Sequence, residues 1–227
     1  PRLDKHSEQL CWISWDHPDL PWDNTQLWLA ELDANGHPVE PRLLAGNGHE
    51  SIVQPCWAPD NQLYFVSDRD NWWNLYRWAP DSDHISALLP MAAEFATPLW
   101  VLGMSNYGFC EDGTLVCSYT QQGSWQLATL PPGNQTLQPV STDFTQISDL
   151  YCEGNRAWLV GGSATRGAEL AQLDTCKRDT QPGQLSVLAR SSSPAIQSGY
   201  LSRPQPVSFP TSGGDIAHGF FYPPANP

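Results

Sequence analysis

A unit of about 40 residues recurs along the chain and limits the folds that it can adopt. One copy spans residues 52–89 and contains four short strand-like runs separated by three turns. The same order returns over 99–140 and 147–188, and it is present without its first run over 10–44. Equivalent third-strand positions, at spacings of 48, 51 and 43 residues, are Trp28, Tyr76, Leu127 and Leu170. Four strands in each unit at this period are typical of a β-propeller.

The physical reason for such an array is that one four-stranded blade exposes apolar residues on both faces. Only stacking against neighbouring blades buries them. Asn35-Gly36 and Asp112-Gly113 supply the positive φ angles that tight hairpins need, and Asn61 can supply one as well. With 21 Pro and 17 Gly, the chain is interrupted too often for long helices.

We therefore expect an all-β fold, a partial β-propeller of four-stranded antiparallel blades with three full blades and one partial blade. The partial blade covers 1–45 and lacks its first strand, and the later blades cover 49–92, 94–140 and 145–190. A Ser- and Pro-rich linker over 191–206 leads to a hairpin over 207–227. Propellers usually close with four to eight blades. The expectation is a fragment of a longer protein, with chain missing before Pro1.

Charge and composition exclude several classes of function. Eleven Lys and Arg against 24 Asp and Glu give a net charge of −13, which would repel a nucleic acid. No apolar run reaches the length that spans a bilayer. The six cysteines form no C-x-x-C pair, and the six His are scattered, so no cofactor or metal is expected. Four cysteines in or beside apolar runs are interpreted as small buried hydrophobes in a reducing cytoplasm, namely Cys11, Cys56, Cys117 and Cys152.

Three motifs could suggest chemistry, and each favours a structural interpretation. The run Gly161-Gly162-Ser163-Ala164-Thr165 lacks the last glycine of a nucleophile elbow and is expected to be a hairpin loop. His218 lies on an expected strand and precedes any nucleophile, so it is expected to be structural. Asp16-His17 with Asp19 and Asp23 is expected to form a solvated acidic loop, because Pro18 and Pro21 extend it and no second His is near.

Candidate site residues lie in loops between second and third strands. Asp68-Arg69-Asp70 either forms an internal ion pair that fixes a turn or recognises a peptide, and the first interpretation is favoured. Trp57, Trp78, Trp100 and Trp158 are expected on strands that fill the space between blades. Trp22, Trp72 and Trp73 are expected in loops on one face of the propeller, where with Arg69 they would form an interdomain or substrate-gating rim.

Three segments resemble known families. The run Trp-Ala-Pro-Asp-Asn-Gln-Leu-Tyr-Phe-Val-Ser-Asp-Arg-Asp at 57–70, followed by Asn74-Leu75-Tyr76, resembles a TolB-type propeller blade. Residues 14–28 are similar to a blade of the acylaminoacyl-peptidase and dipeptidyl-aminopeptidase branch of the prolyl oligopeptidases. The 207–224 hairpin is similar to the start of that family's α/β-hydrolase domain.

The resemblance implies a serine peptidase that hydrolyses short peptides with a Ser-Asp-His triad placed after this chain, which itself contains no catalytic residue. The propeller would gate and select substrates, and its expected partners are its own hydrolase domain, short peptides and a second copy of itself in a homo-oligomer. Two alternatives remain open from the residues alone. One is a stand-alone TolB-like propeller that acts as a protein-interaction scaffold, and the other is a carbohydrate-binding propeller with Trp platforms.

Overall fold

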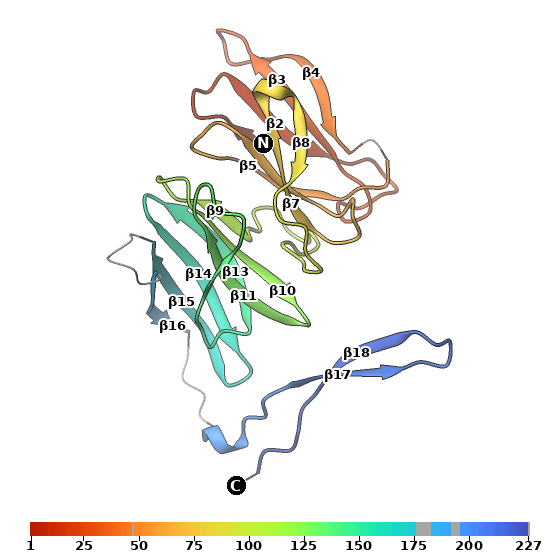
Figure 1. Ribbon diagram of the computed structural model, residues 1–227, viewed down its shortest axis with the longest axis vertical. Coiled ribbons are helices and arrows are strands. Elements are labelled where there is room, and N and C mark those ends of the chain that lie inside the picture. Colours follow the sequence, from red (N-terminus) through yellow and green to blue (C-terminus); the bar gives the residue numbers. More distant parts are fainter. Residues whose placement is uncertain (47, 176–182, 192–195, 227) are drawn as a thin grey trace.

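Four four-stranded antiparallel sheets and one hairpin make up the computed structural model, which describes residues 1–46, 48–175, 183–191 and 196–226 (Figure 1). In every sheet the strands follow one another in sequence order. The first blade contains β1 (Arg2–Leu3), β2 (Gln9–Ser14), β3 (Gln26–Leu32) and β4 (Pro38–Ala45), and the second β5 (Ile52–Trp57), β6 (Leu63–Ser67), β7 (Asn74–Ala79) and β8 (His84–Ala87). The third contains β9 (Tyr107–Phe109), β10 (Leu115–Gln121), β11 (Ser124–Leu130) and β12 (Gln138–Val140). The fourth contains β13 (Gln146–Glu153), β14 (Arg156–Ser163), β15 (Arg166–Asp174) and β16 (Gln184–Arg190).

Short elements complete the chain. A 3₁₀ turn over Pro80–Ser82 joins β7 to β8, and a second over Ser198–Tyr200 precedes the hairpin of β17 (Gln205–Pro210) and β18 (Ile216–Phe221). The described residues contain no helix that is long and apolar enough to cross a bilayer. The predicted partial propeller of four-stranded blades is confirmed, and the four equivalent positions Trp28, Tyr76, Leu127 and Leu170 lie in the third strands β3, β7, β11 and β15.

The turn chemistry expected from the sequence is present. Gly36, Asn61 and Gly113 all adopt positive φ, at 80°, 63° and 82°. These residues lie in the turns β3–β4, β5–β6 and β9–β10, where the backbone must reverse within a few residues. Local turn signals therefore predicted the strand boundaries at these places correctly.

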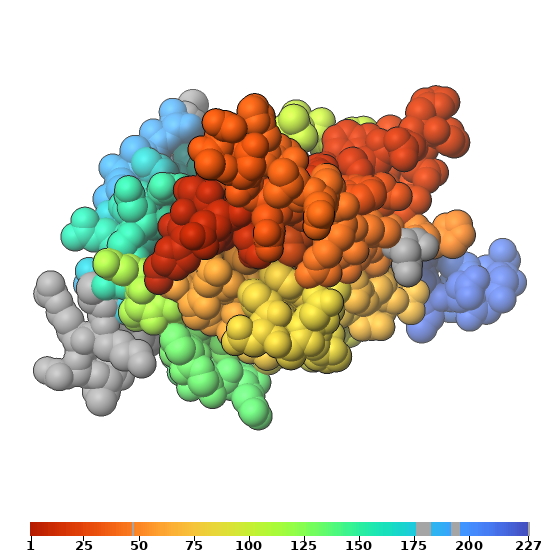
Figure 2. Space-filling model, turned by 90° about the horizontal axis from the view of Figure 1, so that it is seen from above, coloured from red at the N-terminus to blue at the C-terminus, as the bar shows by residue number. Residues whose placement is uncertain are grey.

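The hydrophobic core consists of three layers, one between each pair of neighbouring blades. Leu27 and Leu29 of the first blade pack with Leu63 and Phe65 of the second. Val66 and Leu75 belong to the next layer with Leu115 and Cys117, and Val116 and Leu127 pack with Leu159 and Ala171 of the fourth blade. Figure 2 shows the first two blades packed side by side from above. The layers explain why no blade could bury its apolar faces alone.

The cysteines behave as small hydrophobes in these layers. Cys11, Cys56, Cys117 and Cys152 lie in β2, β5, β10 and β13, as predicted. The five cysteines among the described residues are free, and Cys11, Cys110 and Cys117 are fully buried. Cys176 lies outside the described residues.

Two expectations about strands need correction. The first blade does not lack its first strand, because Arg2–Leu3 forms a two-residue β1 that pairs with Leu10 and Cys11 of β2. The run Leu99 to Phe109 is not one strand, since β9 starts only at Tyr107. Gly103 has φ of 92°, which interrupts an extended run, and Trp100 is 74% exposed in the loop. Trp57, Trp78 and Trp158 do lie on strands, in β5, β7 and β14.

The loops between second and third strands emerge on one face of the stack, together with the connections from blade to blade. We call this face, formed by residues 15–25, 46, 48–51, 68–73, 88–106, 122–123, 141–145 and 164–165, the loop face. Backbone hydrogen bonds join the connections to the blades on both sides: Trp125 N–H donates to Thr145 O at 3.2 Å, and Thr145 N–H donates to Gly162 O at 2.9 Å. The hairpin β17–β18 extends beneath the β10–β11 and β14–β15 ends on this face (Figure 1).

Candidate functional site

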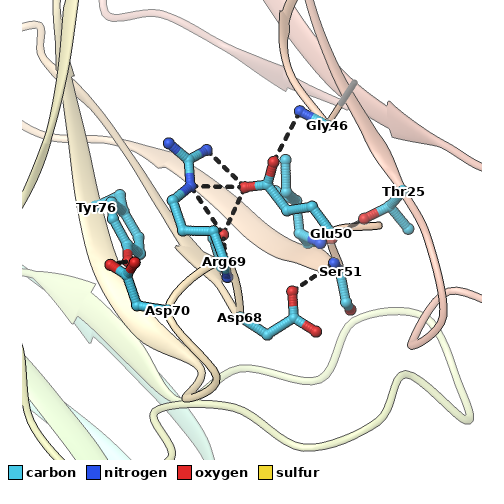
Figure 3. A network of polar contacts seen from close by, with 10 residues as sticks. Thr25, Gly46, Glu50, Ser51, Asp68, Arg69, Asp70 and Tyr76 are labelled. Atoms are coloured by element: carbon cyan, nitrogen blue, oxygen red, sulfur yellow. Dashed lines mark hydrogen bonds and ion pairs between the residues drawn. The ribbon is translucent and has the colours of Figure 1, made fainter. Parts of the chain in front are cut away.

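On the loop face, an ion pair joins the connection that precedes the second blade to the β6–β7 loop of that blade (Figure 3). Arg69 follows β6, and Glu50 lies just before β5. Arg69 donates to Glu50 Oε1 from Nε at 2.9 Å and from Nη2 at 2.5 Å. Ser67 Oγ donates to the same oxygen at 2.5 Å, and Gly46 N–H donates to Oε2 at 3.1 Å. With its side chain only 11% exposed, Glu50 has a partner for each of its oxygens.

Aromatic rings hold the other side of the Arg69 guanidinium. Its Cζ lies 4.7 Å from the ring centroid of Tyr76 and 5.7 Å from that of Phe65, which are cation–π distances. The Tyr76 hydroxyl donates to Asp70 at 2.5 Å. Burial, and then the hydrogen bond to Asp70, raise the pKa of Tyr76 far above its ordinary value. Arg69 is therefore fixed from both sides in one orientation.

The expected ion pair within Asp68-Arg69-Asp70 needs correction. Within the part of the chain that the structure describes, the salt-bridge partner of Arg69 is Glu50 rather than Asp68 or Asp70. Asp68 instead accepts the Ser51 N–H at 2.7 Å, and burial raises the pKa of Asp68 against the effect of that bond. Sequence reasoning missed Glu50, because it lies 19 residues from Arg69 with no spacing that could indicate the contact.

The three loop tryptophans do not form one cluster. Trp22 contacts Trp100, with ring centroids 4.4 Å apart, and no ring contact among the described residues joins it to Trp72 or Trp73. Trp72 is 42% exposed, whereas Trp73 packs against the core between the second and third blades. The backbone N–H of Trp73 donates to Glu94 Oε2 at 2.7 Å. The exposed tryptophans of the loop face are thus Trp15, Trp72 and Trp100, and Trp22 is half-buried against Trp100.

The remaining motifs have structural surroundings. Asp19 accepts from Asn24 Nδ2 at 3.1 Å and Asp23 accepts the Leu20 N–H at 3.0 Å, so these carboxylates hold the 15–25 loop together. Among the described residues, no group of three or more His, Cys, Asp or Glu is arranged to hold a metal ion. Ser163 ends β14 at a hairpin tip, and exposed His218 of β18 pairs through Nδ1 with Ser208 Oγ at 2.8 Å.

A cavity of about 860 Å³ separates the loop face from the hairpin. Its propeller wall comes from the β10–β11 and β14–β15 tips and the connection between them, and its other wall from the base of the hairpin. The lining includes two arginines and three aromatic rings, namely Arg166, Arg203, Trp125, Phe220 and Tyr222. At the closest approach, a Cβ built on Gly123 would lie 2.5 Å from Cζ of Phe220. The cavity can therefore accommodate both charged and apolar groups.

Comparison with known proteins gives no matching family model and no matching curated protein. Solved structures do match. A puromycin-hydrolysing peptidase of Mycobacterium tuberculosis is 30% identical with a TM-score of 0.90, and a puromycin hydrolase is 31% identical with a TM-score of 0.89; both comparisons cover 100% of this chain and 34% of the other. Prolyl oligopeptidase B from Galerina marginata is 13% identical with a TM-score of 0.73 over 96% of this chain and 29% of its own.

The chain matches the propeller portion of the prolyl oligopeptidase family. The chain spans about a third of the length of these structures. The resemblance expected from residues 14–28, 57–70 and 207–224 is thereby confirmed. In this chain, the loop face is the face that the β17–β18 hairpin contacts.

Proposed function

We propose that this chain is the substrate-gating propeller of a serine peptidase that hydrolyses short peptides, with a Ser-Asp-His triad in an α/β-hydrolase domain that follows. In this proposal residues 1–190 are the propeller, 191–206 the linker and 207–227 the first hairpin of the hydrolase domain. The linker includes residues 192–195, which lie outside the described part of the chain. The protein would act in the cytoplasm.

The observation that supports this proposal most strongly is the exposure of apolar side chains on the hairpin. Phe209, Ile216 and Phe221 are 52%, 64% and 51% exposed, and both faces of β17–β18 present apolar side chains to solvent. An isolated two-stranded hairpin is at best marginally stable in water. These side chains need a further sheet or domain to cover them, which is what a hydrolase domain supplies.

The position of the hairpin indicates where that domain would sit. Its base meets the loop face at Gly123, and Ser202 Oγ donates to Pro223 O at 2.6 Å, so the two ends of the hairpin are tied together there. A domain that continues from this hairpin would cover the loop face. The 860 Å³ cavity would then lie in the chamber between the two domains.

Peptides are the substrate class that such a chamber suits. The guanidinium groups of Arg166 and Arg203 can donate hydrogen bonds to the carbonyl and carboxylate oxygens of a peptide, and Trp125 and Tyr222 can pack on its side chains. Size exclusion needs no chemistry from the propeller, because a folded protein cannot enter a covered cavity. Arg69 and Trp72 would form part of the rim of this chamber, Trp22 on Trp100 a separate part of it, and Trp73 a structural support.

The proposal is tested with the full-length protein and peptide substrates of increasing length. We expect rapid hydrolysis of peptides of a few residues and no cleavage of a folded protein that contains the same sequence. A permanently unfolded protein substrate should also be resistant. Cleavage of that long substrate at the rate of the short peptides would contradict gating, and a complete absence of peptide hydrolysis would contradict the peptidase assignment.

A further inference from the structure

Two thiols meet across the interface between the third and fourth blades. Cys110 follows β9, and Cys152 belongs to β13. Cys110 is fully buried in the core layer between these blades, and Cys152 is partly buried and packs against the same layer. The two cysteines come from different blades, so a bond between them would join the blades covalently.

The backbone holds both cysteines in register. Glu111 N–H donates to Gly154 O at 2.7 Å, and Leu150 N–H donates to Ser105 O at 3.0 Å. Gly108 has no side chain that could separate the strands, and a Cβ built there would lie 3.0 Å from Cys152 Sγ. The residues on either side of the two thiols are thus fixed across the blade interface.

The polar contacts of the thiols favour a thiolate at this position. Thr175 Oγ1 lies 3.3 Å from Cys110 Sγ and 2.8 Å from Asn155 O, so its one hydroxyl proton is shared between these two acceptors. A hydrogen bond from Cys152, and then the one from Thr175, lower the pKa of Cys110 although the residue is buried. By contrast, burial without such donors raises the pKa of Cys117 far above its ordinary value. The pair therefore loses its first proton more easily than an isolated buried thiol.

A small molecule can reach Cys152. Cys152 lines a cavity of about 450 Å³ that the first strands of all four blades enclose, together with Gly108, Phe109 and Tyr151. Cys56 of β5 lines the same cavity. A peroxide is small enough to enter such a space, whereas a folded redox protein is not.

We propose that Cys110 and Cys152 form a redox-active dithiol that hydrogen peroxide oxidises to a disulfide between the third and fourth blades. The thiolate of the pair attacks one peroxide oxygen, the O–O bond breaks, and a sulfenic acid and one water result. The sulfur of the second thiol then attacks the sulfenic sulfur, and a second water leaves as the S–S bond forms. Two thiols and one peroxide become one disulfide and two waters, with two electrons passing from sulfur to oxygen.

The test maps the cysteines of the full-length protein before and after exposure to hydrogen peroxide. The reduced protein is treated with peroxide, free thiols are alkylated, and the sample is digested without reductant. Cleavage after Glu111 and after Tyr119 separates Cys110, Cys117 and Cys152 onto different peptides. We expect a crosslinked pair containing Cys110 and Cys152, two hydrogens lighter than the sum of its peptides, which dithiothreitol separates.

Two variants distinguish this pair from other oxidation. Cys110→Ser should form no crosslink and should leave Cys152 free to be alkylated after peroxide, because without the hydrogen bond to the Cys110 thiol burial still raises the pKa of the Cys152 thiol. Cys117→Ser, the matched control in the neighbouring strand β10, should form the crosslink at a rate within about twofold of the wild type. A crosslink of Cys152 to Cys56, a sulfinic acid without a crosslink, or full alkylation of both cysteines after peroxide would each overturn the proposal.

Discussion

Arg69 of the β6–β7 loop binds Glu50 of the connection that precedes β5, with Nε of the arginine 2.9 Å from Oε1 of the carboxylate. Ser67 Oγ and the Gly46 N–H also donate hydrogen bonds to Glu50, and the rings of Tyr76 and Phe65 lie against the guanidinium. The pair is therefore held in one arrangement on the loop face, unlike a mobile ion pair on the surface.

Glu50→Gln tests how much the ion pair between Arg69 and Glu50 stabilises the fold. The substitution should lower the free energy of unfolding by about 2 kcal/mol, because it leaves a partly buried guanidinium without its counter-charge. Chemical denaturation followed by tryptophan fluorescence measures the change. Arg42→Gln is the control, since Arg42 and Asp83 also lie 2.9 Å apart but are 46% and 64% exposed, and its effect should stay below about 1 kcal/mol. Equal losses in the two variants would show that burial of the Glu50 pair is irrelevant.

Gly161→Ala tests the packing between the third and fourth blades. A Cβ at Gly161 of β14 would overlap the ring of Phe144, which is 4% exposed and has little room to move. We expect a loss of about 2 kcal/mol in the free energy of unfolding. Gly162→Ala is the matched control, because its nearest neighbours would be 3.8 Å away, and its effect should be within about 0.5 kcal/mol. An unchanged free energy of unfolding in Gly161→Ala would mean that the ring of Phe144 has room to move at this interface.

Glu94→Gln tests a pH dependence. Burial raises the pKa of Glu94 above its ordinary value of 4.5, and the backbone N–H of Trp73 only partly opposes this. The folded state therefore disfavours the carboxylate, and this contribution to stability is lost as the pH rises above 4.5 through the folded-state pKa. Relative to wild type, Glu94→Gln should show a smaller fall in the free energy of unfolding between about pH 4.5 and 7.

Denaturation across that pH range provides the measurement for Glu94. The amide that Glu94→Gln introduces keeps an oxygen that can accept from the Trp73 N–H, so the hydrogen bond need not be lost. Glu40→Gln, on the exposed surface of β4, controls for the removal of one negative charge. A steeper fall in Glu94→Gln than in wild type would contradict the sign of the pKa shift.

Trp72→Ala tests the proposed rim. Because Trp72 is 42% exposed, its removal should change the free energy of unfolding by less than about 1 kcal/mol. In the full-length protein we expect kcat/KM for short peptides to change by about threefold or more, in line with about 0.7 kcal/mol of lost contact. Asp81→Ala in the 3₁₀ turn over Pro80–Ser82, on the opposite face, should leave kcat/KM unchanged. Identical kinetics of both variants would remove Trp72 from the rim.

The fold could be predicted from the sequence because its signals are local. Asn35-Gly36 and Asp112-Gly113 mark hairpins wherever they occur, and four repeats of the same order make the blade assignment redundant. The apolar run at 99–102 misled the strand assignment, because Gly103 bends the backbone out of an extended path. The contacts of the candidate site were harder to predict from the sequence. The partner of Arg69 depends on how the connection before β5 packs against the β6–β7 loop, and no sequence pattern encodes that contact.

The hydrogen bonds between neighbouring blades on the loop face have a mechanical consequence. Thr25 N–H donates to Glu50 O, Glu94 and Thr120 exchange two backbone bonds, and Thr145 links Trp125 to Gly162. Backbone hydrogen bonds thus join each connection to strands on both sides. A force applied at the base of the hairpin would be shared among several of these hydrogen bonds. We therefore expect force on one blade to reach its neighbours through these bonds before that blade unfolds.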